Sequence, residues 1–318
     1  MSYSGNPTDY SVAVIYGGTS GEREVSLRSG QSCADALASL GFKVTLIDPS
    51  IKEDLVRLVT EAFDVAFLAL HGRGGEDGTI QGFLETVGIP YTGSGVYASA
   101  MAVNKPRAKE AYKTAGLRVA PSLVVGADDV LDEDDYAEMV EIVGIPCVVK
   151  PATEGSSLGM TIVKDPEQIP DALKTALAVD VEALVEGFVE GTECTVAVMG
   201  NGEAEAFPVV QIVPTEDEFY NYHAKYANGG SRHLCPAPLD PDVFEQAQEV
   251  AAAAHAVLGC RGVSRSDIII DAENQCWILE TNTLPGMTAT SLVPDAAAAV
   301  GMDFPHLCEK ILSLALED

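Results

Sequence analysis

The feature that most constrains the fold is a short, continuous apolar run that ends in glycine-rich sequence and occurs twice in the first hundred residues. Val12 to Tyr16 is followed by Gly17-Gly18, and Asp64 to Leu70 by His71-Gly-Arg-Gly-Gly75. Strands that are apolar on both faces are typical of a parallel sheet covered by helices. Both runs are therefore predicted to be buried parallel strands.

The segments between these runs fit the same interpretation. A helical pattern from Ser29 to Leu40 ends at Gly41, and Lys43 to Ile47 has the composition of a strand. The order is thus β-α-β-α-β, an α/β arrangement. Ligands of such sheets gather at the carboxyl ends of the strands, so we expect the two glycine-rich loops to face one cleft.

The pattern changes after Asn104, and two further lobes are predicted. The first has a strand at 123–125, an acidic helix through 128–143, and strands at 146–151, 160–163 and 183–185. The second has strands at 192–198 and 206–213, a helix at 244–258, and a hairpin of 267–270 with 276–280 around the turn 271–275. We expect an N-terminal α/β lobe at 1–104, a central α+β lobe at 105–187 and a C-terminal α+β lobe at 188–318.

Charge restricts the partners. The 318 residues carry 19 basic and 48 acidic side chains, a net charge of -29. Such a surface repels phosphate backbones and anionic lipid, so neither nucleic acid nor a membrane is an expected partner.

The cysteines and the apolar runs indicate a cytoplasmic protein. The seven cysteines are scattered and form no CxxC pair, and the apolar runs are too short for a signal peptide or a membrane span.

The predicted C-terminal hairpin carries the most informative polar residues. If it pairs as described, Asp267 lies beside Glu280 on the neighbouring strand, and Asn282 shares a face with Glu280. Carboxylate and amide oxygens are ligands that magnesium takes together with nucleotide phosphates. Solvated acids near a turn are the alternative explanation.

Glu154-Gly-Ser-Ser-Leu-Gly159 follows the strand that bears Lys150 and has small residues suited to close approach of phosphate oxygens. A plain turn is the alternative, because the GxxxxGK[ST] order is missing. Lys105, Lys150 and Lys225 are scarce cations that a bound polyphosphate would use. Motifs for nicotinamide binding, for a hydrolase nucleophile elbow and for an HExxH zinc site are not found.

Seven segments, in this order, closely resemble the D-alanine-D-alanine ligase family of ATP-grasp enzymes. They run from residue 12 nearly to the end of the chain: Gly17–Ser26, Leu70–Gly78, Pro90–Gly95, Val149–Ser157, Ala224–Tyr226, Gly262–Asp267 and Glu280–Thr288, with Ser291-Leu-Val-Pro294 after them. The resemblance implies an ATP-grasp fold with an N-terminal parallel-sheet lobe. It also implies ATP-dependent ligation of two D-alanines for peptidoglycan synthesis.

The resemblance further implies a nucleotide site between the central and C-terminal lobes. Lys105 and Lys150 would bind the phosphates, the loop of Glu154, Ser156 and Ser157 would close over them, Glu193 would bind the ribose, and main-chain groups near Glu186 would hold the adenine. Asp267, Glu280 and Asn282 would bind Mg²⁺ or Mn²⁺, whose charge offsets that of the triphosphate.

The substrate residues implied by the resemblance lie in several segments. Glu22 would take the ammonium of the first D-alanine, in a hydrogen-bonded set with Ser156 and Tyr226 and with His71 nearby. Lys225, Ser291 and Leu292 would surround the carboxylate of the second. Arg265 and the Gly286 N–H would stabilise the tetrahedral oxyanion. The resemblance also implies a homodimer formed through the N-terminal lobe.

Three positions depart from the family's usual pattern. Asn104 stands where aspartate is usual, Gly187 where a charged residue is common, and His223 where glutamate is frequent. Related vancomycin-resistance ligases that make D-alanyl-D-lactate have histidine in the loop that here has Tyr226, so Tyr226 favours an amine nucleophile. A depsipeptide or other D-amino-acid ligase, and a nucleotide-binding module without turnover, are the alternatives.

Overall fold

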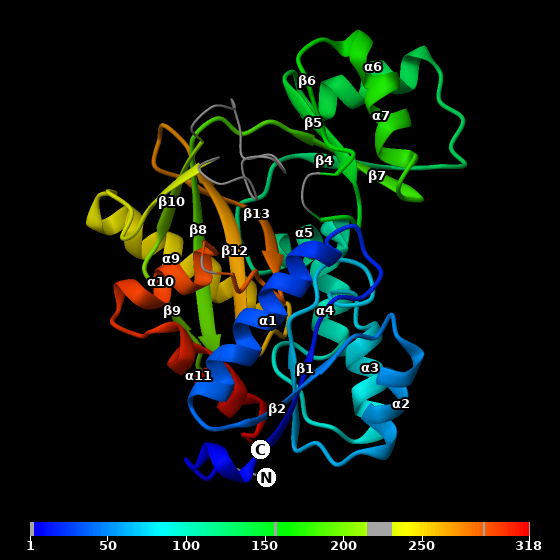
Figure 1. Ribbon diagram of the computed structural model, residues 1–318. Coiled ribbons are helices and arrows are strands. Elements are labelled where there is room, and N and C mark those ends of the chain that lie inside the picture. Colours follow the sequence, from blue (N-terminus) through cyan, green and yellow to red (C-terminus); the bar gives the residue numbers. More distant parts are fainter. Residues whose placement is uncertain (1–2, 156–157, 215–230, 289, 318) are drawn as a thin grey trace.

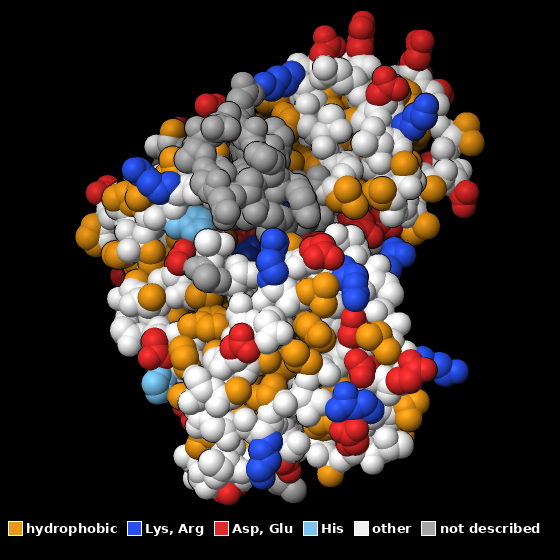
Figure 2. Space-filling view, viewed as in Figure 1, with side chains coloured by type: hydrophobic (Ala, Val, Ile, Leu, Met, Phe, Trp, Pro, Cys, Tyr) orange, Lys and Arg blue, Asp and Glu red, His pale blue; other side chains and the backbone are white. Residues whose placement is uncertain are grey.

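The computed structural model describes residues 3–155, 158–214, 231–288 and 290–317. It is an α/β protein with three sheets. Figure 1 shows an N-terminal lobe, a separate lobe built around the central part of the chain, and a C-terminal lobe that lies against the N-terminal one. Figure 2 shows acidic side chains at many places on the viewed face, including the outer end of the central lobe.

The N-terminal sheet is parallel with strand order β2-β1-β3, as the apolar runs predict. Ala13 pairs with Thr45 on one side and with Ala66 on the other. The elements in chain order are β1 (Ser11–Ile15), α1 (Arg23–Ser39), β2 (Lys43–Ile47), α2 (Lys52–Thr60), β3 (Val65–Leu68), α3 (Thr79–Val87) and α4 (Val96–Val103). A short 3-10 helix (Pro7–Asp9) precedes them.

Helix α1 begins at Arg23, six residues before the predicted start at Ser29, so that prediction was wrong at its N-terminal end. Ser26 explains why, because it is a polar residue on the buried face of the helix. Its hydroxyl donates to the carbonyl of Ala69 at 2.7 Å and accepts from the N–H of Gly17 at 2.8 Å. A buried serine whose hydroxyl has hydrogen-bond partners in other segments interrupts the apolar periodicity from which a helix is predicted.

The central sheet has the order β4-β7-β5-β6 and is antiparallel throughout. The predicted acidic helix is shorter than expected, because Asp132 caps it with hydrogen bonds to the N–H groups of Asp134 and Asp135. The elements are α5 (Lys105–Thr114), β4 (Ser122–Gly126), α6 (Glu133–Val143), β5 (Cys147–Pro151), β6 (Thr161–Val163), a 3-10 helix (Pro166–Gln168), α7 (Ile169–Leu177) and β7 (Glu182–Gly187).

The C-terminal sheet has the order β11-β10-β8-β12-β13, with β9 on β8. The single strand predicted at 206–213 is divided, because Pro208 has no N–H to donate to a ladder. The elements are β8 (Thr192–Gly200), β9 (Glu205–Ala206), β10 (Val210–Pro214), β11 (Ser231–Leu234), α9 (Pro241–Val257), β12 (Gly262–Ile270), β13 (Cys276–Asn282), α10 (Leu292–Ala299) and α11 (Phe304–Ala315).

Contacts between the lobes cross the predicted boundaries. Helix α11, at the end of the chain, packs on α1, and one buried cluster holds Leu37 of α1 together with Leu307 and Ile311 of α11. Helix α5 packs on β13 and α9, with Tyr112 in a cluster beside Ile278. The boundaries predicted at residues 104 and 187 remain a proposal. Within the described residues, none of the helices has both the length and the apolar content that crossing a bilayer requires.

Candidate active site

The two glycine-rich loops of the N-terminal sheet lie side by side, as expected for the carboxyl ends of parallel strands. Ser20 in the first loop donates to the carbonyl of His71 in the second at 2.7 Å. The first loop turns through Gly17 and Gly18, whose φ angles are 76° and 73°. Glycine adopts this left-handed conformation without the steric cost that a side chain brings.

Arg23 and Asp48 hold the first loop in place. Arg23 donates to a carboxylate oxygen of Asp48 at 2.7 Å and to the carbonyl of Gly18 at 2.6 Å. Burial raises the pKa of Asp48, but hydrogen bonds from Arg23, Ser50 and Gly18 outweigh it and lower that pKa to about 2. The carboxylate is therefore ionised at neutral pH and fixes the start of α1.

This anchoring places Glu22 at the junction of three segments. A Cβ atom added to Gly72 would lie 2.9 Å from Oε2 of Glu22, and one added to Gly155 would lie 3.2 Å from the same oxygen. The second glycine-rich loop and the glycine-serine segment of the central lobe thus both approach this carboxylate closely. The structure thus places the Glu22 carboxylate where these loops meet, and its role toward the ammonium of a substrate stays a prediction.

His71 is buried between the N-terminal and C-terminal lobes. Its Nδ1 lies 3.2 Å from the carbonyl oxygen of Leu284, and its Nε2 lies 3.1 Å from the Ser29 hydroxyl. A carbonyl only accepts, so Nδ1 is the donor in the contact with Leu284, and the Ser29 hydroxyl is the hydrogen-bond partner of Nε2. His71 therefore joins the second glycine-rich loop to the segment that follows β13.

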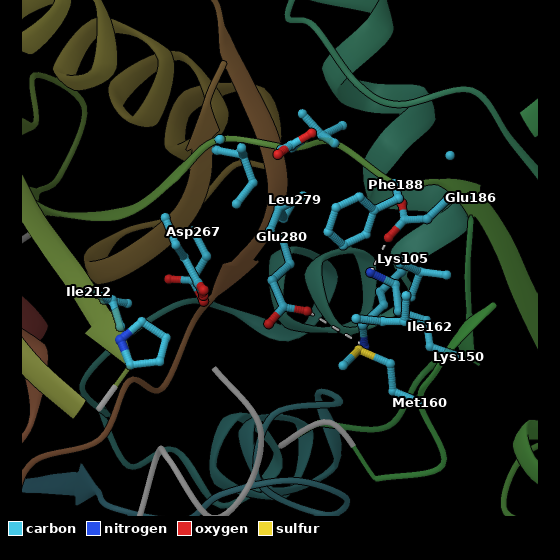
Figure 3. Close-up of a pocket in the computed structure, with 18 of the residues that line it drawn as sticks. Lys105, Lys150, Met160, Ile162, Glu186, Phe188, Ile212, Asp267, Leu279 and Glu280 are labelled. Atoms are coloured by element: carbon cyan, nitrogen blue, oxygen red, sulfur yellow. Dashed lines mark ion pairs between the residues drawn. The ribbon is translucent and has the colours of Figure 1, made fainter. Parts of the chain in front are cut away.

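A cavity of about 580 Å³ lies between the central sheet and the C-terminal sheet. Its walls combine apolar side chains, among them Ile162 and Phe188, with a concentration of charged groups (Figure 3). The predicted residues Lys105, Lys150, Glu154, Glu186, Glu193, Asp267 and Glu280 all line it. The fold thus brings together seven predicted residues that lie far apart in the sequence.

Lys150 and Glu186 face the cavity from neighbouring strands of the central sheet. Val148 is opposite Glu186 in the register of β5 and β7, so Lys150, two residues further, projects from the same face. The lysine ammonium forms an ion pair with one oxygen of the Glu186 carboxylate. Burial opposes the charge on Lys150, but the carboxylates of Glu186 and Glu280 outweigh it and raise the lysine pKa.

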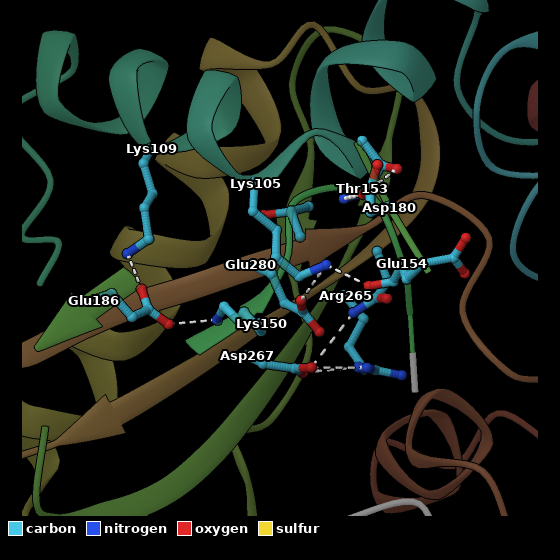
Figure 4. A network of polar contacts seen from close by, with 12 residues as sticks. Lys105, Lys109, Lys150, Thr153, Glu154, Asp180, Glu186, Arg265, Asp267 and Glu280 are labelled. Carbon is cyan, nitrogen blue, oxygen red and sulfur yellow. Dashed lines mark hydrogen bonds and ion pairs between the residues drawn. The ribbon is translucent and has the colours of Figure 1, made fainter. Parts of the chain in front are cut away.

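Lys105 links the glycine-serine segment to the C-terminal sheet. Its Nζ donates to the main-chain carbonyl of Glu154 at 2.6 Å and lies 3.7 Å from Oε2 of Glu280 (Figure 4). The start of the same segment is tied to Asp180, which accepts from the N–H and the hydroxyl of Thr153 at 2.7 and 2.8 Å. Lys105, a cation in the cavity wall, therefore also fixes the start of the predicted phosphate-binding segment at Glu154.

The predicted pairing of Asp267 with Glu280 is confirmed by the register of β12 and β13. The ladder shifts directly after this pair, so that Ile268 faces Ile278 and Leu279 is the extra residue of a bulge. The Asp267 carboxylate accepts from the Thr195 hydroxyl at 2.6 Å and lies 3.4 Å from the amide nitrogen of Asn282. The three proposed metal ligands thus meet at one end of the hairpin.

Arg265 lies beside these residues on β12. Its guanidinium donates to both oxygens of Asp267, at 2.9 and 2.8 Å. The resemblance assigns Arg265 to a developing oxyanion, and the structure places its guanidinium against Asp267, which lines the cavity. Its assignment to the oxyanion stays a prediction.

The segment after β13 contains the remaining predicted residues. A Cβ atom at Gly286 would lie 3.0 Å from the Ser291 hydroxyl, which in turn accepts from the N–H of Thr288 at 2.9 Å. The side chain of Leu292 packs with Val210 and Ile212 in an apolar cluster, so its polar contribution comes from the main chain at the start of α10. Ser156, Ser157, Lys225, Tyr226 and His223 lie outside the described residues.

One contact beside the cavity was not predicted. Lys109 forms an ion pair with Glu186 at 2.6 Å. The signal for it in the sequence was the spacing of four between Lys105 and Lys109, which places both on one face of a helix.

The structure also explains two departures from the usual pattern of the family. Asn104 caps α5 by accepting from the N–H of Arg107 at 3.1 Å, and a Cβ atom at Gly187 would lie 2.8 Å from the carbonyl oxygen of Val143. An asparagine can cap the helix as aspartate does, and glycine avoids a steric clash.

Comparison with known proteins agrees with this geometry. The family description "D-ala D-ala ligase C-terminus" matches residues 111–313 and "D-ala D-ala ligase N-terminus" matches residues 50–94. The D-alanine--D-alanine ligase of Syntrophobacter fumaroxidans is 48% identical over 310 residues, covering 96% of this chain and 98% of its own length. That of Anaeromyxobacter sp. strain Fw109-5 is 48% identical over 313 residues, covering 97% of each chain.

Solved structures show the same similarity. The VanG D-Ala:D-Ser ligase of Enterococcus faecalis superposes with a TM-score of 0.84 at 29% identity, covering 96% of this chain and 99% of that one. The D-alanine--D-alanine ligase of Bacillus anthracis complexed with ATP superposes with a TM-score of 0.83 at 29% identity, covering 96% and 97%. The matches extend over both lobes that form the cavity and over the N-terminal lobe. The chain therefore belongs to the D-alanine–D-alanine ligase family and has its ATP-grasp fold.

Proposed function

We propose that this protein joins two D-alanine molecules at the expense of ATP and supplies the dipeptide for peptidoglycan synthesis. The observation that carries the proposal is the charged cavity between the central and C-terminal sheets, in which Lys105 and Lys150 face Asp267 and Glu280. Relatives named D-alanine--D-alanine ligase, 48% identical over nearly the whole chain, support it.

ATP occupies this cavity in the proposal. Lys105 and Lys150 bind its phosphates, Ser156 and Ser157 close over them from the segment that Glu154 begins, and Glu193 binds the ribose. Main-chain groups near Glu186 hold the adenine, and apolar residues such as Phe188 pack on the ring. The volume of about 580 Å³ lies within the range of pockets that enclose ligands of this size.

Mg²⁺, or Mn²⁺ in its place, fits the donors at the end of the hairpin. Within the described residues there is no cluster of three or more His, Cys, Asp or Glu side chains suited to a metal. Two carboxylates and an amide, from Asp267, Glu280 and Asn282, are nevertheless the oxygen donors that Mg²⁺ takes when nucleotide phosphates complete its coordination. When bound, the cation offsets the charge of the triphosphate and of the transferring phosphoryl group.

The substrates bind at the N-terminal loops and at the start of α10. Glu22 receives the ammonium of the first D-alanine, with Ser156 and Tyr226 completing the hydrogen-bonded set and His71 nearby. The carboxylate of the second is held by Lys225, by Ser291 and by the main chain of Leu292. Helix N-termini favour anions, which supports this placement of the carboxylate.

The chemistry follows from the poor electrophilicity of a carboxylate. An oxygen of the first D-alanine attacks the γ-phosphorus of ATP, ADP leaves, and an acyl phosphate is formed. The amine of the second D-alanine, having lost a proton, attacks the carbonyl carbon, and the carbon–oxygen bond to phosphate then breaks. Arg265 and the N–H of Gly286 stabilise the intervening oxyanion, which in comparable sites is worth about 3 kcal/mol per donor.

The acyl phosphate must be protected from water. We propose segments 153–159 and 219–230 as the lid, since lids protect hydrolysable intermediates in other enzymes. Residues 156–157 and 219–230 lie outside the part of the chain that the structure describes. The anchoring of Thr153 by Asp180 and of Glu154 by Lys105 supports this role for the first segment, because both contacts fix its root.

Release of phosphate in the presence of ATP, Mg²⁺ and D-alanine tests the proposal. We expect release that depends on D-alanine and yields one dipeptide per phosphate. Nucleotide binding without D-alanine-dependent release would favour a binding module instead. Replacing D-alanine as the second substrate by D-lactate or D-serine tests the two other ligase activities, and L-alanine serves as the stereochemical control.

Two further proposals concern the oligomeric state of the protein and its location in the cell. Exposed apolar side chains on and beside α2, at Ile51, Val56 and Val59, support a homodimer formed through the N-terminal lobe. Light scattering of the purified protein tests this proposal, and a monomer would contradict it.

We also propose a cytoplasmic location, which agrees with the need for ATP. Fractionation of cells that produce the protein tests it.

A further inference from the structure

Lys109 is a buried cation behind the wall of the cavity. It lies on α5 with 1% of its surface exposed, and its Nζ is 2.6 Å from Oε2 of Glu186. The other oxygen of this carboxylate pairs with Lys150, as Figure 4 shows. Lys150 and Glu186 line the cavity, whereas Lys109 is separated from it by Glu186. Lys109 can thus act on a ligand in the cavity only through Glu186 and Lys150.

The contact between Lys109 and Glu186 acts through charge. Nζ and Oε2 meet without a well-directed hydrogen bond. Burial raises the pKa of Glu186, but the two lysines outweigh it and hold that pKa at about 2, so the carboxylate stays ionised. Burial and Lys150 lower the pKa of Lys109, while the carboxylate favours its charged form.

The arrangement of the three groups determines the charge of the cavity wall. Two ammonium groups share one carboxylate, so Lys109, Glu186 and Lys150 together carry one positive charge. Glu186 and Lys150 alone would be neutral, and the attraction of this wall for an anion would fall accordingly. Burying a lysine carries a desolvation cost that an apolar side chain in the same space would avoid.

We propose that Lys109 is a positioning residue that neutralises Glu186 from behind and so leaves the charge of Lys150 to the phosphates of the nucleotide. The inference rests on the proposed binding of ATP in this cavity. It assigns to Lys109 a contribution to affinity that grows with the charge of the ligand, and little contribution to the chemical steps.

Calorimetric titration of Lys109→Met with ATP, ADP and adenosine, without D-alanine, tests this proposal. We expect ATP affinity to fall by about tenfold or more, ADP affinity to fall less, and adenosine affinity to stay within about twofold of the wild type. Lys109→Arg keeps the charge and should retain most of the ATP affinity. In steady-state assays KM for ATP should rise while kcat changes little. An equal loss for adenosine and ATP, or no loss for ATP, would overturn the proposal.

Lys113→Met is the matched control. Lys113 lies one helical turn further on α5, is 44% exposed and pairs with Glu110 at 2.7 Å. Its replacement removes the same charge from the same helix without touching the buried group. We expect unchanged affinity for all three ligands, and a loss of ATP affinity equal to that of Lys109→Met would contradict a local effect.

The double variant Lys109→Met/Glu186→Gln separates charge from packing. It removes both buried charges behind Lys150 and restores one positive charge at the wall, so ATP affinity should return to within about threefold of the wild type. If the single variant does not fold, the double variant can still be measured, because it has no buried carboxylate at position 186 that needs a second cation. Affinity as weak as in the single variant would refute the charge mechanism. If the wild type itself fails to bind ATP, the proposed function fails instead.

Discussion

The guanidinium of Arg265 holds the carboxylate of Asp267 through two hydrogen bonds, from Nε to Oδ1 at 2.9 Å and from Nη2 to Oδ2 at 2.8 Å. Both residues lie on β12, two positions apart, so their side chains share one face of the strand. A paired, planar guanidinium loses little further freedom when it donates to a substrate. The arrangement places a rigid cation next to a proposed metal ligand.

Replacing Arg265 by alanine should separate binding from turnover. We expect at least a hundredfold fall in kcat, the size expected for one oxyanion donor, while affinity for ATP is largely kept. Arg265→Lys keeps a charge without the two-pronged geometry and should restore only part of the rate. Near-normal turnover of Arg265→Ala would remove the residue from the oxyanion site.

Asp267→Asn should raise the Mg²⁺ concentration needed for half-maximal activity by about tenfold or more, because a neutral amide binds a divalent cation less strongly than a carboxylate. Titration of activity with Mg²⁺ after treatment with a chelator measures this. The control is Asp271→Asn at the tip of the same hairpin, where the carboxylate accepts from the Trp277 indole at 2.7 Å. An equal change in both variants would contradict the proposed metal site.

Gly72→Ala should weaken binding of the first D-alanine. The new methyl group would stand 2.9 Å from Oε2 of Glu22 and displace the carboxylate, so KM for D-alanine should rise about tenfold while ATP affinity is unchanged. Gly74→Ala is a matched control, since it has a similar positive φ of 84° but no atom within 4 Å of the added Cβ. If both variants behave alike, backbone strain is the cause and Glu22 is not implicated.

Asp48→Asn should lower stability in a manner that depends on pH. The pKa of Asp48 is lowered to about 2 in the folded chain, against about 3.9 in an unfolded one. This pKa difference corresponds to about 2.6 kcal/mol of stabilisation, which solvent screening reduces to about 1–2 kcal/mol because the partner Arg23 is 37% exposed. The stabilisation is present above the unfolded pKa of about 3.9 and is lost as the pH falls toward 2. Denaturant unfolding of both proteins at pH 7 and pH 3 should show the difference shrinking. A constant difference would mean that the carboxylate's charge is not involved.

Local sequence patterns were sufficient for the features that depend on neighbours in the chain. The apolar runs predicted the parallel sheet, and the alternation around the turn 271–275 predicted that Asp267 faces Glu280, which the register confirms. These features follow from the period of two in a strand and from the burial of both faces of a parallel sheet. Together with the resemblance to the ligase family, they led to the fold and to most of the residues around the cavity.

Tertiary structure decided which side chains meet across the lobes. His71 bonds to Ser29 and to Leu284, residues 42 and 213 positions away, and α11 packs on α1 from the other end of the chain. The early start of α1 was hidden because Ser26 is buried yet satisfied by Ala69. Lys109 meets Glu186 only because α5, which packs on β13 and α9, passes close to the end of β7 that bears Glu186. Sequence periodicity reports which face of an element is apolar, whereas contacts such as these depend on how separate elements pack, and that is settled by the free energy of the whole fold.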